Sequence, residues 1–163
     1  MHILAGAYDL YKPPGHTHPP RRLMPPRTSS VEFRVRYAET DRMGVVYHSH
    51  YLVWCEIGRT DLIRASGMPY REMEERGVAL AVAEAEIRYK SPARYDDMVR
   101  VDTVISAVAS RTVTFDYVIS NAVSGETLAT ARTVLVSLNR DHRVVTLPRD
   151  VRDLLARDAA GPA

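Results

Sequence analysis

The sequence predicts an α+β protein in which one antiparallel sheet curls around one long helix. Residues 51–66 have the length and apolar spacing of a helix of about four turns, which Gly67 and Pro69 end. Five other segments have the character of strands, and most of them alternate apolar with polar residues. Short turns join most of these strands, so neighbours run antiparallel and form a single layer against the helix.

The first 30 residues differ from the rest of the chain. They contain six of the ten prolines, and these prolines occur in pairs that cannot continue a helix or a central strand: Pro13-Pro14, Pro19-Pro20 and Pro25-Pro26. We therefore expect a Pro-rich tail over residues 1–30, either disordered or loosely packed. A single domain is expected over residues 31–157, followed by a C-terminal tail over residues 158–163.

The domain begins with a strand over residues 31–37, where Val31, Phe33, Val35 and Tyr37 alternate with charged residues. In the long helix the predicted apolar stripe consists of Leu52, Cys55, Leu62 and Ile63, widened by Trp54 and Ile57. The remaining elements are a short helix, four strands and a final helix, expected at residues 70–76, 78–89, 99–107, 112–119, 128–138 and 148–157.

Composition and charge exclude several classes of function. Residues 1–30 carry four basic residues and one acid, whereas the whole chain has a net charge of +2, so residues 31–163 sum to −1. The domain is therefore not a basic nucleic-acid binder, and the four scattered charges of the tail make only a weak case for contact with RNA or anionic lipid. No apolar run approaches the roughly 18 residues of a membrane helix, and no secretory signal is evident. The single cysteine excludes an internal disulfide and a multi-cysteine zinc site. We expect a cytoplasmic protein without membrane insertion, nucleic-acid partner, metal or other cofactor.

The segment between the first strand and the long helix carries the candidate chemistry. Asp41 follows the strand, Gly44 comes three residues later, and the helix begins beyond His48. A helix start presents free backbone N–H groups and a partial positive charge. It can polarise a carbonyl oxygen while a nearby carboxylate attacks the carbonyl carbon or activates a water.

Three other interpretations of these residues remain open. An aspartate before a glycine turn is commonly only a turn residue. Asp41, His48 and His50 could hold a metal ion, although no further ligand is evident. Cys55 could pair with His48 in nucleophilic catalysis, although its place in an apolar helix favours a core position.

Residues 34–51 closely resemble the active-site signature of the 4-hydroxybenzoyl-CoA thioesterase family. The variant with Tyr-His after paired valines is similar to the bacterial acyl-CoA thioesterases associated with the Tol-Pal envelope system. The similarity covers about residues 31–150, and the matching residues are Thr40-Asp41, Gly44-Val45-Val46, Tyr47-His48, Glu56, Arg59 and Tyr89-Lys90-Ser91-Pro92-Ala93.

The resemblance implies a hotdog fold and hydrolysis of a short-chain, medium-chain or aromatic acyl-CoA to the free acid and CoA. In the family the aspartate that matches Asp41 is a nucleophile or general base, and backbone N–H groups near the match to His48 form the oxyanion hole. We expect His48 and Tyr47 to belong to the catalytic residues together with Asp41, with the His48 side chain helping to bind or orient the thioester and with Gly44 and Val45 in support. Family members also form homodimers or homotetramers with sites composed of both chains.

Two further groups of residues are candidates. Related hotdog enzymes use a glutamate on the helix as catalyst, but here we favour a supporting hydrogen bond between Glu56 and Arg59. Phosphates of CoA suit a cluster of cations at a strand end, although a solvated strand end explains the same residues equally well: Arg88, Lys90, Ser91 and Arg94. An acyl carrier protein could replace CoA as the carrier.

Competing functions share the same fold. A hotdog hydratase or dehydratase would need a catalytic histidine with an acidic partner, for which only His48 and Glu56 qualify. A non-catalytic acyl-CoA-binding regulator would discard the carboxylate, but Asp41 is present. An envelope-linked interaction protein would use the Pro-rich tail for docking.

Overall fold

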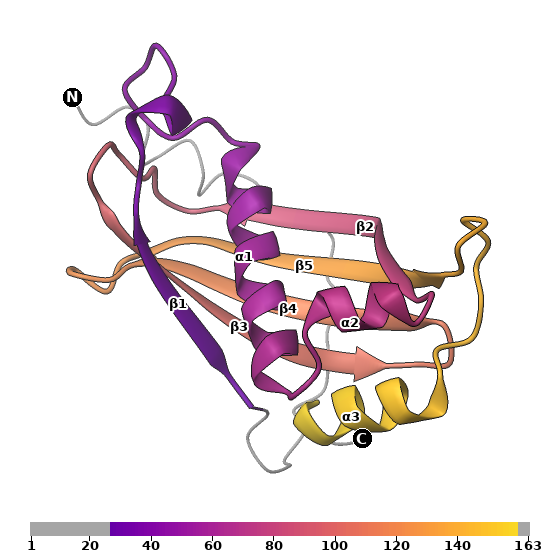
Figure 1. The fold of residues 1–163 in the computed structure, drawn as a ribbon. Coiled ribbons are helices and arrows are strands. Elements are labelled where there is room, and N and C mark those ends of the chain that lie inside the picture. Colours follow the sequence, from indigo (N-terminus) through magenta and orange to yellow (C-terminus); the bar gives the residue numbers. More distant parts are fainter. Residues whose placement is uncertain (1–26, 160–163) are drawn as a thin grey trace, which may run out of the picture.

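The computed structural model describes residues 27–159 and contains one five-stranded antiparallel sheet wrapped around one long helix (Figure 1). The predicted α+β fold is therefore confirmed. In chain order the elements are β1 (Ser29–Arg34), the 3-10 helix η1 (Tyr37–Glu39), α1 (His50–Ala65), α2 (Tyr70–Glu75), β2 (Ala79–Tyr89), β3 (Met98–Val108), β4 (Thr112–Asn121), β5 (Thr127–Leu138) and α3 (Arg149–Asp158).

The strands are arranged in the order β1-β3-β4-β5-β2, and every neighbouring pair is antiparallel. The three central strands follow one another along the chain, whereas β1 and β2 form the two edges. Helix α1 lies across the inner face and packs mainly on β3, β1 and β4 (Figure 1). The helix thus carries the chain from one edge of the sheet to the other.

The core lies between α1 and the inner face of the sheet. Alternate residues of each central strand are buried there, among them Val101, Ile105, Phe115 and Ile119. Helix α1 approaches β3 closely at Gly58, where a Cβ atom would lie 2.3 Å from the Thr103 Oγ1 atom. A glycine at this position lets the helix backbone rest directly on β3.

Part of the predicted apolar stripe of α1 is wrong. Leu52 and Ile57 are 37% and 40% exposed, whereas Tyr51 and Gly58 are buried. The contact at Gly58 fixes the rotation of the helix, so the buried arc is centred on the turn around Gly58. Leu52 and Ile57 consequently fall on the flanks of that arc.

The first strand is shifted towards the N-terminus relative to its predicted bounds. Ser29 already pairs with Thr103, and its hydroxyl donates to Asp61 of α1. The strand ends at Arg34, and the chain then turns into η1, which leaves Tyr37 77% exposed instead of on the buried face. Residues 1–26 and 160–163, most of the two predicted tails, lie outside the described residues. No helix within residues 27–159 is long and apolar enough to span a membrane.

Candidate active site

Asp41 lies at the start of a tight hairpin turn directly after η1. Its N–H donates to the Val45 oxygen and its carbonyl accepts from the Gly44 N–H, each at 2.9 Å. Gly44 has a φ of +73°, which only glycine adopts without strain, so the turn is a type I turn closed by a glycine bulge. The bridge between Thr40 and Val46 closes the hairpin. We call residues 40–46 the Asp41 hairpin.

The Asp41 carboxylate serves the turn with only one of its oxygens. Its Oδ1 atom accepts the Met43 N–H at 2.7 Å, the local bond expected of an aspartate in a turn. No group of residues 27–159 bonds the Oδ2 atom. The side chain is half-buried, so the turn fixes the carboxylate while one oxygen stays available to a ligand.

The start of α1 is held beside this hairpin by backbone contacts. The Tyr47 N–H donates to the Glu39 oxygen and the Val46 N–H to the Ala93 oxygen, both at 2.9 Å. The Tyr89 hydroxyl donates to the His48 oxygen at 2.9 Å. These bonds reach the last residues before α1 from three separate segments, so the approach to the helix is rigid.

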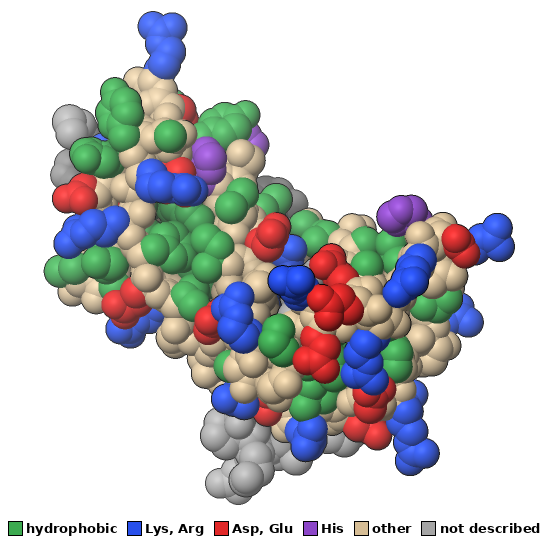
Figure 2. Space-filling model, viewed as in Figure 1, with side chains coloured by type: hydrophobic (Ala, Val, Ile, Leu, Met, Phe, Trp, Pro, Cys, Tyr) green, Lys and Arg blue, Asp and Glu red, His purple; other side chains and the backbone are tan. Residues whose placement is uncertain are grey.

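The first turn of α1 is suited to an anionic oxygen. Its N-cap residue, Ser49, makes no side-chain capping bond with any described residue, and the first turn of this helix contains no acid. The N–H groups and the positive end of the helix dipole are therefore not neutralised from within the helix. Tyr47 and His48 are both exposed with ring centroids 4.2 Å apart, and histidines lie on the surface where α1 begins (Figure 2).

A buried carboxylate that the sequence did not reveal to us lies between the hairpin and the helix. Glu39 is only 3% exposed, and its Oε1 atom accepts the Trp54 indole N–H and the Arg36 guanidinium, both at 3.1 Å. Its Oε2 atom accepts the Arg36 backbone N–H at 2.6 Å. Burial favours the neutral acid, but these hydrogen bonds from Arg36 and Trp54 hold the pKa of Glu39 below its usual 4.5.

A signal for Glu39 was nevertheless present in the sequence. It continues the alternation of Val35 and Tyr37, so an acid falls on the apolar side of the strand pattern. Trp54, the single tryptophan of the chain, also needs an acceptor for its N–H when it is buried. These two signals indicate a buried acid and an indole that needs an acceptor, but the bond between Glu39 and Trp54 is evident only in the fold.

The helix candidates are placed differently from one another. Glu56 is exposed, whereas the Arg59 side chain is only 13% exposed and lies 3.6 Å from Glu56, an ion-pair distance longer than a hydrogen bond. Within residues 27–159, no hydrogen bond joins His48 to Glu56, the pair that a hydratase would need. Burial raises the pKa of the Cys55 thiol to about 12, so this thiol is neutral and unsuited to nucleophilic catalysis.

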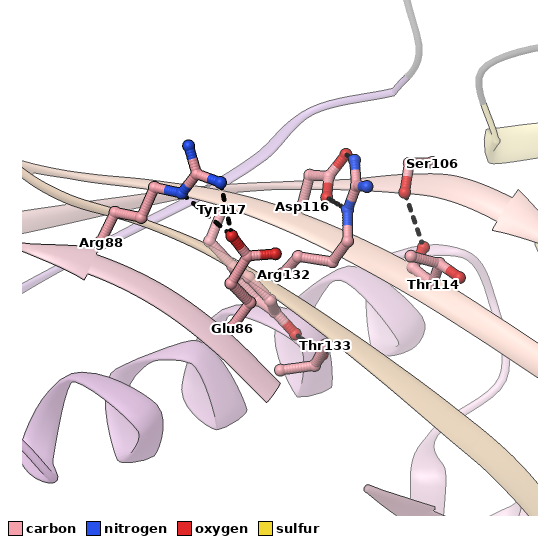
Figure 3. A network of polar contacts seen from close by, with 8 residues as sticks. All are labelled: Glu86, Arg88, Ser106, Thr114, Asp116, Tyr117, Arg132 and Thr133. Carbon is pink, nitrogen blue, oxygen red and sulfur yellow. Dashed lines mark hydrogen bonds and ion pairs between the residues drawn. The ribbon is translucent and has the colours of Figure 1, made fainter. Parts of the chain in front are cut away.

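The candidate phosphate-binding residues do not form one cluster. Arg88 lies on the outer face of the sheet, where it pairs with Glu86 at 2.7 Å beside the Arg132–Asp116 pair (Figure 3). A surface depression of about 420 Å³ lies there. By contrast, the other three candidates lie beyond the end of β2: Lys90, Ser91, whose hydroxyl donates to Glu126, and Arg94, whose backbone N–H donates to Asp97.

In the part of the chain that the structure describes, no three His, Cys, Asp or Glu side chains converge as metal ligands would. The metal interpretation of Asp41, His48 and His50 thus has no support from the geometry. Nor does any hydrogen bond join Cys55 to His48 within residues 27–159, as nucleophilic catalysis by this pair would require.

A five-stranded antiparallel sheet curled around a single long helix defines the hotdog class of proteins. The model of the thioesterase-like superfamily matches residues 35–155, so the chain belongs to this family of thioester hydrolases. The predicted family and enzyme class are thereby confirmed.

Named relatives and solved structures agree with this assignment. The putative acyl-CoA thioesterase YneP of Bacillus subtilis is 45% identical over 93 residues, which cover 57% of this chain and 67% of that protein. The acyl-CoA thioesterase YbgC of Haemophilus influenzae is 32% identical over 124 residues, or 76% of this chain and 90% of that one. The crystal structure of a DHNA-CoA thioesterase from Staphylococcus aureus is 32% identical, has a TM-score of 0.76, and covers 80% of this chain and 89% of its own.

Proposed function

We propose that the protein hydrolyses a short-chain, medium-chain or aromatic acyl-CoA to the free acid and CoA, with Asp41 as the catalytic carboxylate. The observation that carries this proposal is the Asp41 hairpin itself. One oxygen of the carboxylate is fixed by the Met43 N–H, the other is available, and the hairpin is tied by backbone bonds to the residues that begin α1. The names of the relatives support the acyl-CoA class of substrate.

In this mechanism the thioester carbonyl lies between Asp41 and the start of α1. N–H groups near His48 donate to the carbonyl oxygen and stabilise the negative charge that develops on it, an effect worth roughly 3–4 kcal/mol per donor elsewhere. The Oδ2 atom of Asp41 then attacks the carbonyl carbon or removes a proton from an attacking water. The carbon–sulfur bond breaks, and CoA leaves as the thiolate. If Asp41 itself attacks, the acyl group remains on Asp41 as a mixed anhydride, which water then hydrolyses to the free acid and the restored carboxylate. If water attacks, the free acid forms directly, and the proton taken by Asp41 passes to the departing thiolate.

We assign the remaining candidates to substrate binding. The rings of Tyr47 and His48 stand exposed at the helix start and orient the thioester, while Gly44 and Val45 shape the turn. Lys90, Ser91 and Arg94 project near the end of β2 and are placed to meet phosphates, with Arg88 reaching the outer surface. Glu56 and Arg59 act in support as a loose ion pair on α1.

The decisive experiment is Asp41→Asn, which keeps the shape of the side chain and removes its charge. Turnover of an acyl-CoA panel, followed by thiol release, should fall at least ~10²-fold, the lower end for loss of a general base. Affinity for a non-hydrolysable analogue should change little, since the interaction lost belongs to the transition state. Asp102→Asn, on the outer face of β3, is the matched control and should retain full turnover. Normal turnover of Asp41→Asn would remove Asp41 from the mechanism.

We further propose that two copies pair along β2 to complete each site. This strand is an 11-residue edge of the sheet, and the side chains of residues 82–86 are all exposed. An edge of this length invites pairing with another strand. Light scattering should give a dimer or a dimer of dimers, and a fully active monomer would contradict the composite site.

A further inference from the structure

Glu39 is the only charged residue that is fully buried within residues 27–159. Burying a carboxylate costs several kcal/mol unless it is well paired, and apolar residues at such a place are often at least as stabilising. Stability alone is therefore a weak reason for an acid at this position. Its location suggests another reason, since it lies two residues before Asp41.

Glu39 connects the hairpin to the helix through both its backbone and its side chain. Through its backbone it accepts the Tyr47 N–H at 2.9 Å, which closes the base of the Asp41 hairpin. Through its side chain it accepts the indole N–H of Trp54, one turn into α1. Trp54 is itself immobilised, because it is fully buried and its ring contacts those of Phe33 and Tyr51.

We infer that Glu39 is a positioning residue that sets the distance between the Asp41 hairpin and the start of α1. This inference rests on the proposed function of Asp41. The carboxylate and the oxyanion-binding N–H groups come from different elements, and a 1 Å misplacement can cost about 10²-fold in rate. Glu39 directly precedes the hairpin, and its bond to Trp54 is a side-chain link from there to the body of the helix.

A carboxylate suits this role better than an amide. Its two oxygens meet three donors, with the Arg36 backbone N–H on Oε2 and the other two on Oε1. In Glu39→Gln, whichever way the amide turns, its NH₂ group faces at least one N–H donor. The side chain keeps its size, but the link to Arg36 or to Trp54 is lost.

The test uses Glu39→Gln and Trp54→Phe in the full chain, singly and together. Each single variant should lower kcat by roughly tenfold or more with KM nearly unchanged, because the site is misaligned and not removed. The double variant should lose less than the product of the two single effects on kcat, since Glu39 and Trp54 share one hydrogen bond. Glu32→Gln is the matched control, because it breaks an exposed ion pair with Arg100 and should leave kcat unchanged.

Two readouts are independent of turnover. Trp54 is the only tryptophan, so its indole N–H gives a single resolved NMR signal, which should shift in Glu39→Gln but not in Glu32→Gln. Hydrogen exchange of the Met43 and Gly44 amides, which hold the turn, should be faster in both positioning variants. Circular dichroism checks that each variant is folded, and Trp54→Phe decides the matter if Glu39→Gln does not fold.

Unchanged hairpin exchange or unchanged kcat in the folded variants would overturn the positioning role. A rise in KM with normal kcat would also overturn it, since that result describes substrate binding. The proposed function fails separately, through normal turnover of Asp41→Asn, so the two failures are distinguishable.

Discussion

Polar side chains have different surroundings on the two faces of the sheet, although successive residues of one strand lie on opposite faces. Asp116 and Arg132 lie on the outer face and pair with each other at 2.6 Å and 2.9 Å (Figure 3). The residues that follow them, Tyr117 and Thr133, lie on the inner face, buried, with their hydroxyls 2.8 Å apart. The alternation of side chains along each strand therefore places charged, ion-paired groups in solvent on the outer face and uncharged hydroxyl groups in the core on the inner face.

The comparison shows where polar groups matter energetically. On the outer face the ion pairs are partly exposed, so each contributes at most about 1 kcal/mol. On the inner side a buried group left without a partner costs about 1–3 kcal/mol. The Thr103 Oγ1 atom is such a group, because it is buried without a hydrogen-bond partner among the described residues. Among the buried polar residues described, Glu39 alone is charged, and three hydrogen bonds compensate for the burial of its carboxylate.

The largest loss of stability is expected for Gly58→Ala, on the inner face. The new Cβ atom would lie 2.3 Å from the Thr103 Oγ1 atom and 3.0 Å from the Val101 Cγ1 atom, so either these buried side chains or α1 must shift. The free energy of unfolding should fall by about 3 kcal/mol, the upper part of the usual range for overpacking. Urea unfolding measures this loss. Adding Thr103→Ala should restore part of it, and strictly additive losses would contradict the contact.

An intermediate effect, with a defined pH dependence, is expected for Glu39→Gln. The folded-state pKa of Glu39 is lowered, so its carboxylate stabilises the fold fully above its unfolded pKa, near 4.5. This contribution is lost as the pH falls through the lower folded pKa. The stability difference from the natural protein should be about 2 kcal/mol at neutral pH and shrink steadily below pH 4.5. A difference that grows in acid would show that Glu39 is buried as the neutral acid.

The smallest effect is expected on the outer face, for Asp116→Asn. The side chains of Asp116 and Arg132 are 33% and 45% exposed, so water and salt screen the pair. The free energy of unfolding should fall by less than about 1 kcal/mol, and by still less in high salt. A loss comparable to that of Gly58→Ala would abolish the distinction between the two faces.

Most of the fold could be predicted from local patterns in the sequence. Strand periodicity and the glycines that end the first two α-helices located every strand and α-helix, because these signals depend only on near neighbours. The short helix η1 was not predicted, and its first residue was assigned to the strand before it. The position of β2 beside β5, at the far edge from β1, could not be predicted this way, since strand order depends on contacts between distant segments. The rotation of α1 was missed for a similar reason, because Gly58 shows its role only against Thr103.

The candidate site likewise contains residues that could be predicted from the sequence and residues that could not. Asp41 and Gly44 were recognisable because they occupy one short stretch with fixed spacing. The supports of that stretch come from elsewhere in the chain: Tyr89 holds the His48 carbonyl, and Ala93 holds Val46. The family resemblance includes Tyr89 and Ala93, but the bonds that these residues make to the start of α1 depend on the fold and could not be predicted from the sequence.

The strand order also has a consequence for the folding pathway. Strands β3, β4 and β5 are joined by short turns, whereas β1 pairs Ser29 with Thr103 and β2 pairs Ala79 with Leu138. Closing such long loops costs more entropy, so the central meander is expected to form first and both edges to join it later. The Asp41 hairpin is synthesised early, yet its supporting strands emerge from the ribosome much later. A nascent chain therefore cannot assemble the site until nearly the whole domain has been made.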